Sequence, residues 1–265
     1  MYLLLAIGIS IAVLMISGAL LGFIAGFVDG FNDKAPNDDA IWQSNIVYYT
    51  VAFAFLLIGM LLHLVFLGLG FSSYTLGRIP QGGRLKVILL MMVIMAGIAV
   101  IYTIVYNPLS EPANAVFGEP DKDSRSIFIW MNQHLWYSIP LFSFVEVTID
   151  MVLFGAILRE LLEWKHRPLL VIGALLLIMS IVYCFSENNI WVILLSMLML
   201  VIDAWTYECT RSIIPLIVGD SFFWVVALLL MGSTISLWFI LPVAAIIIPA
   251  VYCLVRTMDP YKPID

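Results

Sequence analysis

Two carboxylates stand in an otherwise apolar stretch of this chain, and their spacing places them on one helix face. Glu146 and Asp150 are four residues apart within "FVEVTIDMVLFGAILREL" at 144–161, and side chains at i and i+4 are neighbours on a helix. A third acid, Asp220, lies in the middle of another apolar stretch. Because an ionised side chain in hydrocarbon is costly, acids in such segments are candidate functional sites.

Asp150 and Asp220 are expected at the same depth in the membrane. Asp150 lies nine residues before Arg159, and Asp220 lies nine residues after Arg211. At about 1.5 Å of rise per residue, each carboxylate is about 13 Å from the basic end of its helix. If the two helices touch, the two carboxylates face each other at one level.

Three roles are open for the set of Glu146, Asp150 and Asp220. Clustered carboxylates are hard oxygen ligands and could bind a divalent cation. Acids inside a membrane could also carry protons or ions along a path. In the simplest structural role they are protonated, neutral and hydrogen-bonded to neighbouring helices.

Other acids and the remaining reactive side chains give weaker signals. We expect Asp203 and Glu208 to be shallower and either to reach the interface or to pair with Arg211. The histidines are scattered, with no Cys, Asp or Glu at ligand spacing, and the cysteines have no metal-site spacing; packing is the expected role of His63 and of the cysteines. They are His63, His134 and His166, and Cys184, Cys209 and Cys253.

The composition places the chain in a membrane. It is 63% hydrophobic and 11% charged over 265 residues, against roughly 45–50% and about 25% for soluble domains. No basic cluster indicates nucleic acid. The first apolar run lacks the features of a signal peptide, so we expect it to be retained as a span.

We predict an all-α polytopic membrane protein with a single transmembrane domain over 1–265. A span needs about 20 apolar residues. The eight predicted spans are 3–28, 46–70, 85–106, 127–158, 168–186, 190–207, 212–230 and 233–256.

The loop charges predict the orientation of these spans. Acidic loops alternate with basic ones, and placing the basic loops in the cytoplasm puts nine of the twelve Lys and Arg residues inside. Both termini then lie in the cytoplasm, as an even number of spans requires. We expect the plasma (inner) membrane of a prokaryote.

Small residues mark one face of the first predicted span. Gly18, Gly22 and Gly26 recur every four residues, which allows another helix to approach closely. The expected partner is another helix of this chain. A membrane-protein partner or a second copy is the alternative.

The layout resembles the CPBP family of CAAX-processing and bacteriocin-processing intramembrane proteases. The stretch 71–97 is similar to the family's cytoplasmic link between spans two and three. The stretch "FVEVTIDMVLFGAIL" at 144–158 is similar to the helix with the family's EExxFRG motif. The stretch "YECTRSIIPLIVGDSFFW" at 207–224 is similar to the segment with a ligand His and, four residues later, Asn.

Within the EExxFRG motif the chain departs from the family at its chemical positions. Where the family has two glutamates, this chain has Ile149 and Asp150. Phe154 replaces the motif Arg, whereas Gly155 is kept. The general base that activates water is therefore altered.

The metal ligands implied by the resemblance are also replaced. The first ligand His falls between positions 182 and 187, where there is none, and Asp220 and Trp224 stand in place of the second His and the Asn. The family's mechanism needs a metal to polarise the scissile carbonyl. Without both His ligands and the Arg, that mechanism should be lost.

The leading hypothesis is therefore a non-catalytic, degenerate CPBP-like protein. It would act as a scaffold, bind a membrane partner or hold a small ligand in the former active site, much as a subunit of γ-secretase with a related fold is thought to act. The first alternative is a metal-dependent hydrolase using Glu146, Asp150 and Asp220. The second is an ion- or proton-coupled transporter. A divalent metal at Asp150 and Asp220 is an alternative that we do not expect.

Overall fold

The computed structural model describes a helical bundle. Every regular element in the described part of the chain is a helix. The described residues are 58, 81–106, 116–117, 131–159, 161–162, 168–186, 189–231, 233 and 235–258. The helices are α4 (Gln81–Val105), α7 (Leu135–Asp150), the π-helix η1 (Met151–Leu158), α9 (Pro168–Ser186), α10 (Ile190–Thr210), α11 (Ile214–Leu230), the 3₁₀ helix η2 (Leu237–Phe239) and α12 (Ile240–Met258).

The prediction of an all-α protein is confirmed for the described residues, and helices lie within each of the last six predicted spans. Three helical stretches are long and apolar enough to cross a membrane: Gly83–Val105, Ile190–Thr210 and Leu237–Met258. These stretches support a membrane-embedded protein. The predicted spans 3–28 and 46–70 lie outside the described residues except for Ile58. The count of eight spans and the cytoplasmic termini therefore stay predictions.

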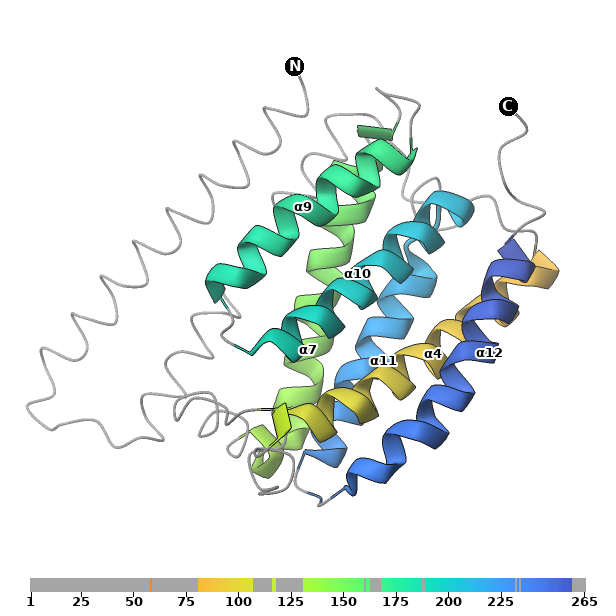
Figure 1. The fold of residues 1–265 in the computed structure, drawn as a ribbon. Coiled ribbons are helices and arrows are strands. Elements are labelled where there is room, and N and C mark those ends of the chain that lie inside the picture. Colours follow the sequence, from red (N-terminus) through yellow and green to blue (C-terminus); the bar gives the residue numbers. More distant parts are fainter. Residues whose placement is uncertain are drawn as a thin grey trace, which may run out of the picture.

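The helices form two packed groups that share α10 and α11. Helix α4 packs against both α11 and α12, whereas α7 lies along α11 and α9 along α10 (Figure 1). One apolar cluster is built from α4, α10, α11 and α12, with Met95 and Phe223 among its members. A second cluster joins η1 and α9 to α10 and α11 through side chains such as Phe154 and Tyr207.

Close packing on the α4 side depends on two glycines. A Cβ atom at Gly97 would lie 2.5 Å from Cγ1 of Ile247. Any larger residue at position 97 would therefore force α12 or the Ile247 side chain to move away from α4. A Cβ at Gly219 would lie 3.2 Å from Cγ of Met95. Small residues at such contacts let helix backbones approach each other in a membrane.

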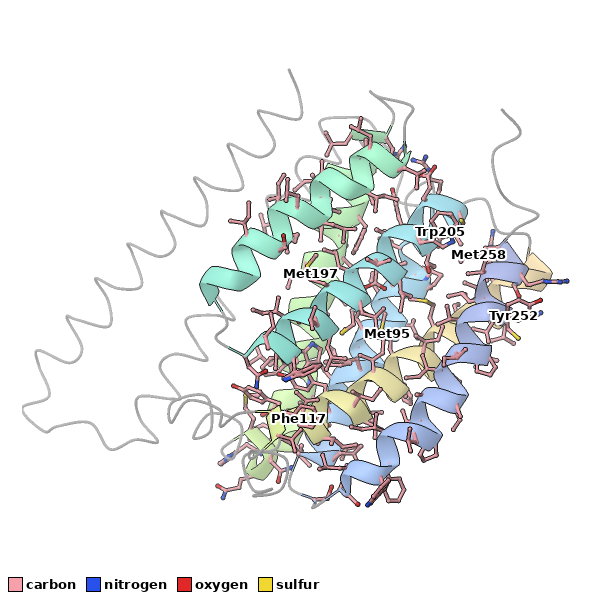
Figure 2. All side chains as sticks on the ribbon, in the orientation of Figure 1. Met95, Phe117, Met197, Trp205, Tyr252 and Met258 are labelled. Carbon is pink, nitrogen blue, oxygen red and sulfur yellow. The ribbon has the colours of Figure 1, made fainter. Side chains whose placement is uncertain are left out.

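The outer surface of α12 is apolar. Ile246, Ile248 and Tyr252 are exposed, whereas Met95 on α4 is fully buried (Figure 2). A helix with exposed apolar residues is suited to lipid, because the hydrocarbon does not penalise exposed Ile or Leu.

Caps define the two ends of α10, the helix that contributes most to the site described below. The side chain of Asn189 accepts hydrogen bonds from the backbone N–H groups of Trp191 (3.0 Å) and Val192 (3.4 Å). At the other end Arg211 is left-handed (φ 52°), and its N–H donates to the carbonyl of Tyr207. An αL residue is a common way to end a helix. With this cap, α10 ends at Thr210, three residues beyond the predicted end at 207.

Candidate functional site

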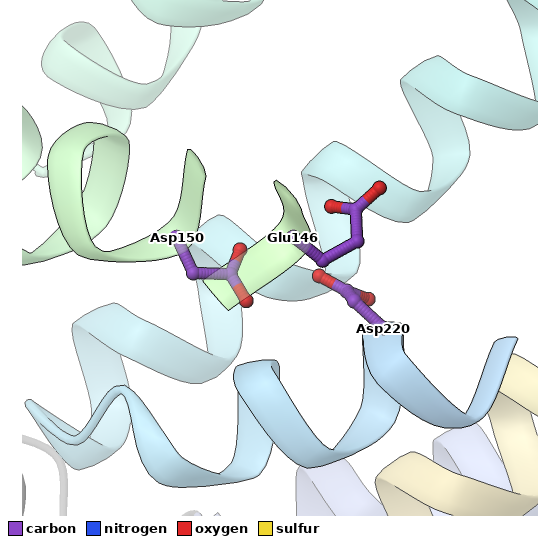
Figure 3. A group of neighbouring side chains, drawn as sticks. All are labelled: Glu146, Asp150 and Asp220. Carbon is purple, nitrogen blue, oxygen red and sulfur yellow. The ribbon is translucent and has the colours of Figure 1, made fainter. Parts of the chain in front are cut away.

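The three predicted acids meet where α7 packs against α11. Glu146 and Asp150 come from α7 and Asp220 from α11, as Figure 3 shows. One carboxylate oxygen from each lies within 4.8 Å of the other two. Asp150 and Asp220 were expected to face each other only if the fourth and seventh predicted spans touch. In the structure the corresponding helices, α7 and α11, pack against each other.

Two of the three acids are buried and Glu146 is half-buried, and not all of the hydrogen-bonding capacity of the buried pair is used. Asp150 is 1% exposed and Asp220 is 3% exposed. Two carboxyl oxygens, Oδ2 of Asp150 and Oδ1 of Asp220, have no hydrogen-bond partner among the described residues. Buried polar atoms are nearly always paired, so unpaired oxygens call for a missing partner.

Glu146 is held by a neighbouring tryptophan. The indole Nε1–H of Trp224 donates to Oε1 of Glu146. Trp224 lies one turn beyond Asp220 on α11 and also stacks on Phe142 of α7, with ring centroids 4.4 Å apart. The resemblance presents Trp224 as a lost Asn, whereas in the structure it orients one of the acids.

The helix geometry changes immediately after Asp150. The predicted span 127–158 is longer than a bilayer needs, and a kink at Pro140 or first turns at the interface were the expected reasons. In the structure α7 runs through Pro140 to Asp150, and the π-helix η1 follows. Phe154 in η1 is 2% exposed, and its ring lies 6.1 Å from that of Tyr207 on α10. π-Helical segments are rare, and they are frequent at functional sites because they re-aim side chains within a helix.

The acids line a cavity of about 280 Å³ between the two packed groups. Lining residues come from α4, α7, η1, α9, α10 and α11. Four of them are acids: Glu146, Asp150, Asp203 and Asp220. Four are aromatic: Tyr102, Phe154, Phe223 and Trp224. Among the described residues that line the cavity, none is Lys, Arg or His.

The expectation that Asp203 is shallow is corrected by this arrangement. Asp203 is 4% exposed and lines the cavity, and its Oδ1 has no hydrogen-bond partner in the described part of the chain. Because α10 continues to Thr210, Asp203 lies seven residues inside the helix end, about 10 Å along the axis. Asp203 on α10 and Asp220 on α11 therefore lie at nearly the same distance from the loop that joins these two helices.

Glu208 pairs with Arg211, which is one of the two roles expected for it from the sequence. Its carboxylate lies 2.8 Å from the guanidinium of Arg211. Glu208 and Arg211 therefore form the predicted ion pair, near the end of α10.

The remaining candidates do not join this site. His134 is described and does not line the cavity. Cys209 is buried and Cys253 is exposed, and neither forms a disulfide with another described residue. The other two histidines, the side chain of Cys184 and the glycine face of the first predicted span (Gly18, Gly22 and Gly26) lie outside the described residues.

Sequence reasoning missed Asp203, Tyr102 and Trp224 as parts of the site. The sequence contained an indication of the depth of Asp203. Asp203 lies eight residues before Arg211, and Asp220 lies nine residues after it. Trp224 was singled out only as the residue in place of the family's Asn. Tyr102 carried no signal, because aromatic residues are common in apolar helices.

Comparisons with known proteins give no assignment. No protein-family model matches the chain, and no match was found among curated proteins or solved structures.

Proposed function

We propose that this chain is a non-catalytic integral membrane protein that binds a small cationic ligand in its buried acidic cavity. The observation that carries the proposal is the convergence of Glu146, Asp150 and Asp220, whose oxygens lie within 4.8 Å of one another. With Asp203 they give the cavity four carboxyls and no basic partner among its described lining residues. Several ionised carboxylates in low dielectric repel one another, and a cation in the cavity relieves that repulsion.

Binding fits the lining better than hydrolysis does. A hydrolase needs a positioned base and a group that stabilises the developing oxyanion. The described lining offers carboxyls and, for hydrogen-bond donation, chiefly the hydroxyls of Ser196 and Tyr102 and the indole of Trp224. The indole N–H already donates to Glu146. A metal held by the three acids would supply the missing electrophile, which keeps metal-dependent hydrolysis as the second candidate.

The same proposal includes the setting of the protein. We place it in a plasma (inner) membrane with its basic loops in the cytoplasm, following the loop charges. Following the resemblance to the CPBP family, we propose that the cavity is a former active site of that family. Gly18, Gly22 and Gly26 stay the proposed contact face for a membrane partner or a second copy.

The test is cation binding by the purified protein in detergent. Elemental mass spectrometry measures resident metal. Thermal unfolding with added Ca²⁺, Mg²⁺, Zn²⁺ or n-butylammonium measures stabilisation, because a ligand of the folded state raises the unfolding temperature. We expect at least one cation to stabilise the wild type. We expect Asp150→Asn and Asp220→Asn to abolish that effect.

Glu208→Gln is the matched control, because it removes an acid that does not line the cavity. It should leave cation binding unchanged. If no metal and no organic cation binds the wild type, the proposed function is wrong. Resident metal together with peptidase activity would favour the hydrolase. Cation flux in proteoliposomes that requires Asp150 would favour the transporter.

A further inference from the structure

We propose that the cation bound in this cavity is the ammonium group of a small aliphatic amine rather than a metal ion. This inference rests on the proposed function and adds the chemical class of the ligand. Three features carry it: the spacing of the acids, the aromatic side chains beside them, and the size and lining of the cavity.

The three acids lie close enough together to meet the donors of one primary ammonium. Such a group has three N–H donors and no acceptor. Charge-assisted N–H···O contacts are about 2.7–2.9 Å long, so three acceptors in tetrahedral directions lie about 4.6 Å apart. One oxygen from each of Glu146, Asp150 and Asp220 lies no more than 4.8 Å from the other two, a limit that includes this separation. The unpartnered oxygens of Asp150 and Asp220 supply two of the acceptors.

Aromatic rings form the adjacent wall. Tyr102 lies 5.4 Å from Phe223 and 6.4 Å from Trp224, and Phe223 lies 5.3 Å from Trp224, all measured between ring centroids. All three rings line the cavity beside Asp220. Ammonium groups are attracted to the faces of such rings, and carboxylates combined with aromatic side chains are a common way to bind them.

The cavity is larger and less polar than a metal site requires. Its volume of about 280 Å³ corresponds to about nine water molecules at about 30 Å³ each. Ca²⁺ takes six to eight oxygen ligands and Mg²⁺ takes six, yet apart from the acids the polar lining is limited to Ser196, Tyr102 and Trp224. Leu153, Met179 and Met199 complete the wall. They offer an apolar surface to the alkyl part of an amine.

The test is isothermal titration of the full chain in detergent near neutral pH. The probes are n-butylammonium, its uncharged analogue n-butanol, and Ca²⁺, Mg²⁺ and Zn²⁺. We expect n-butylammonium to bind more tightly than each metal ion, and n-butanol not to bind. Asp150→Asn and Asp220→Asn should each weaken amine binding at least about tenfold, because each removes a charge-assisted hydrogen bond.

Phe223→Leu tests the aromatic wall. It should weaken n-butylammonium binding about three- to thirtyfold and leave any metal binding unchanged. Glu208→Gln should bind the amine as the wild type does. Gel filtration and the unfolding temperature check that each variant is folded, and the comparison of butylammonium with butanol needs no variant.

The outcomes separate the inference from the function on which it rests. Metal binding without amine binding would overturn the inference and leave the proposed function standing. Equal binding of n-butanol and n-butylammonium, or amine binding that survives both Asp substitutions, would also overturn it. If neither metal nor amine binds, both proposals fail.

Discussion

Two acids on α10, five residues apart, have opposite surroundings. Glu208 lies near the helix end, where Arg211 of the same chain places a guanidinium 2.8 Å away. Asp203 lies deeper, 4% exposed, in a cavity whose described lining contains three more acids and no base. Glu208 has a counter-ion on its own helix end, whereas no counter-ion of Asp203 is found among the described lining residues.

This difference distinguishes an acid with a structural role from an acid that is available to bind a ligand. Burying a carboxylate without a partner is costly, and the chain provides a partner for Glu208. Four carboxyls around one cavity, with no cationic side chain among the described lining residues, are suited to take a cation from outside. Predictions that alter either acid, or supply the missing cation, test this distinction.

The largest effect is expected from removing the counter-ion of Glu208. Arg211→Ala should lower the free energy of unfolding by about 3 kcal/mol, because it removes the counter-ion of a mostly buried carboxylate. Thermal unfolding in detergent, followed by tryptophan fluorescence, measures the loss. Arg211→Lys keeps the charge at the same αL position and should retain most of the stability. Equal losses in the two variants would mean that the ion pair contributes little.

Supplying a cation to the cavity should block the ligand. Ser196 lines the cavity two helical turns before Asp203. Ser196→Lys would tether an ammonium there and should weaken n-butylammonium binding about ten- to a hundredfold, because a tethered group competes at high effective concentration. Titration calorimetry measures the change.

Ser196→Met is the matched control, since it adds a side chain of similar length without charge. It should weaken binding less than Ser196→Lys does. If the Met variant blocks binding as strongly, the block is steric and the charge argument is wrong.

Removing the acid of α10 that lines the cavity should stabilise the protein. Asp203→Leu should raise the free energy of unfolding by about 1–2 kcal/mol, because it replaces a buried, incompletely paired carboxyl with an apolar group of similar size. The measurement is again thermal unfolding in the absence of ligand. Glu208→Leu, the same exchange at the paired acid, should instead destabilise. A destabilised Asp203→Leu variant would show that Asp203 has a structural partner.

The smallest effect concerns the length of the ligand. Asp203 lies apart from the three clustered acids on the same cavity, so it is placed to meet a second charge. We expect 1,4-diaminobutane to bind about fivefold more tightly than n-butylammonium, about 1 kcal/mol for one added ion pair. In Asp203→Asn the two amines should bind equally. A preference that survives this substitution would assign the second charge to another acid.

The helix positions were largely predictable from hydropathy and caps. The predicted span 168–186 has the same bounds as α9, and α10 begins at Ile190 as predicted. Long apolar runs bounded by polar residues define such helices locally. The end of α10 was misplaced by three residues because Arg211 ends the helix through an αL conformation, which composition does not reveal.

The candidate site was predictable only in part. The helical period of Glu146 and Asp150, and the matching depth of Asp150 and Asp220, are properties of the chain. The break from α-helix to π-helix after Asp150 was not predictable, because the residues 151–158 are all ordinary apolar helix formers apart from Gly155. The hydrogen bond from Trp224 to Glu146 joins residues 78 apart and depends on which helices pack together.

The amino-acid sequence by itself determined that this chain is helical, apolar enough for a membrane, and marked by buried acids at defined depths. These properties follow from local composition and from the rise of the helix. Only the tertiary structure decided which faces meet. By packing α7 and α10 against α11, it gathered four carboxyls around one cavity and left Glu208 to Arg211, because contacts between distant helices depend on the packing of side chains along their whole length.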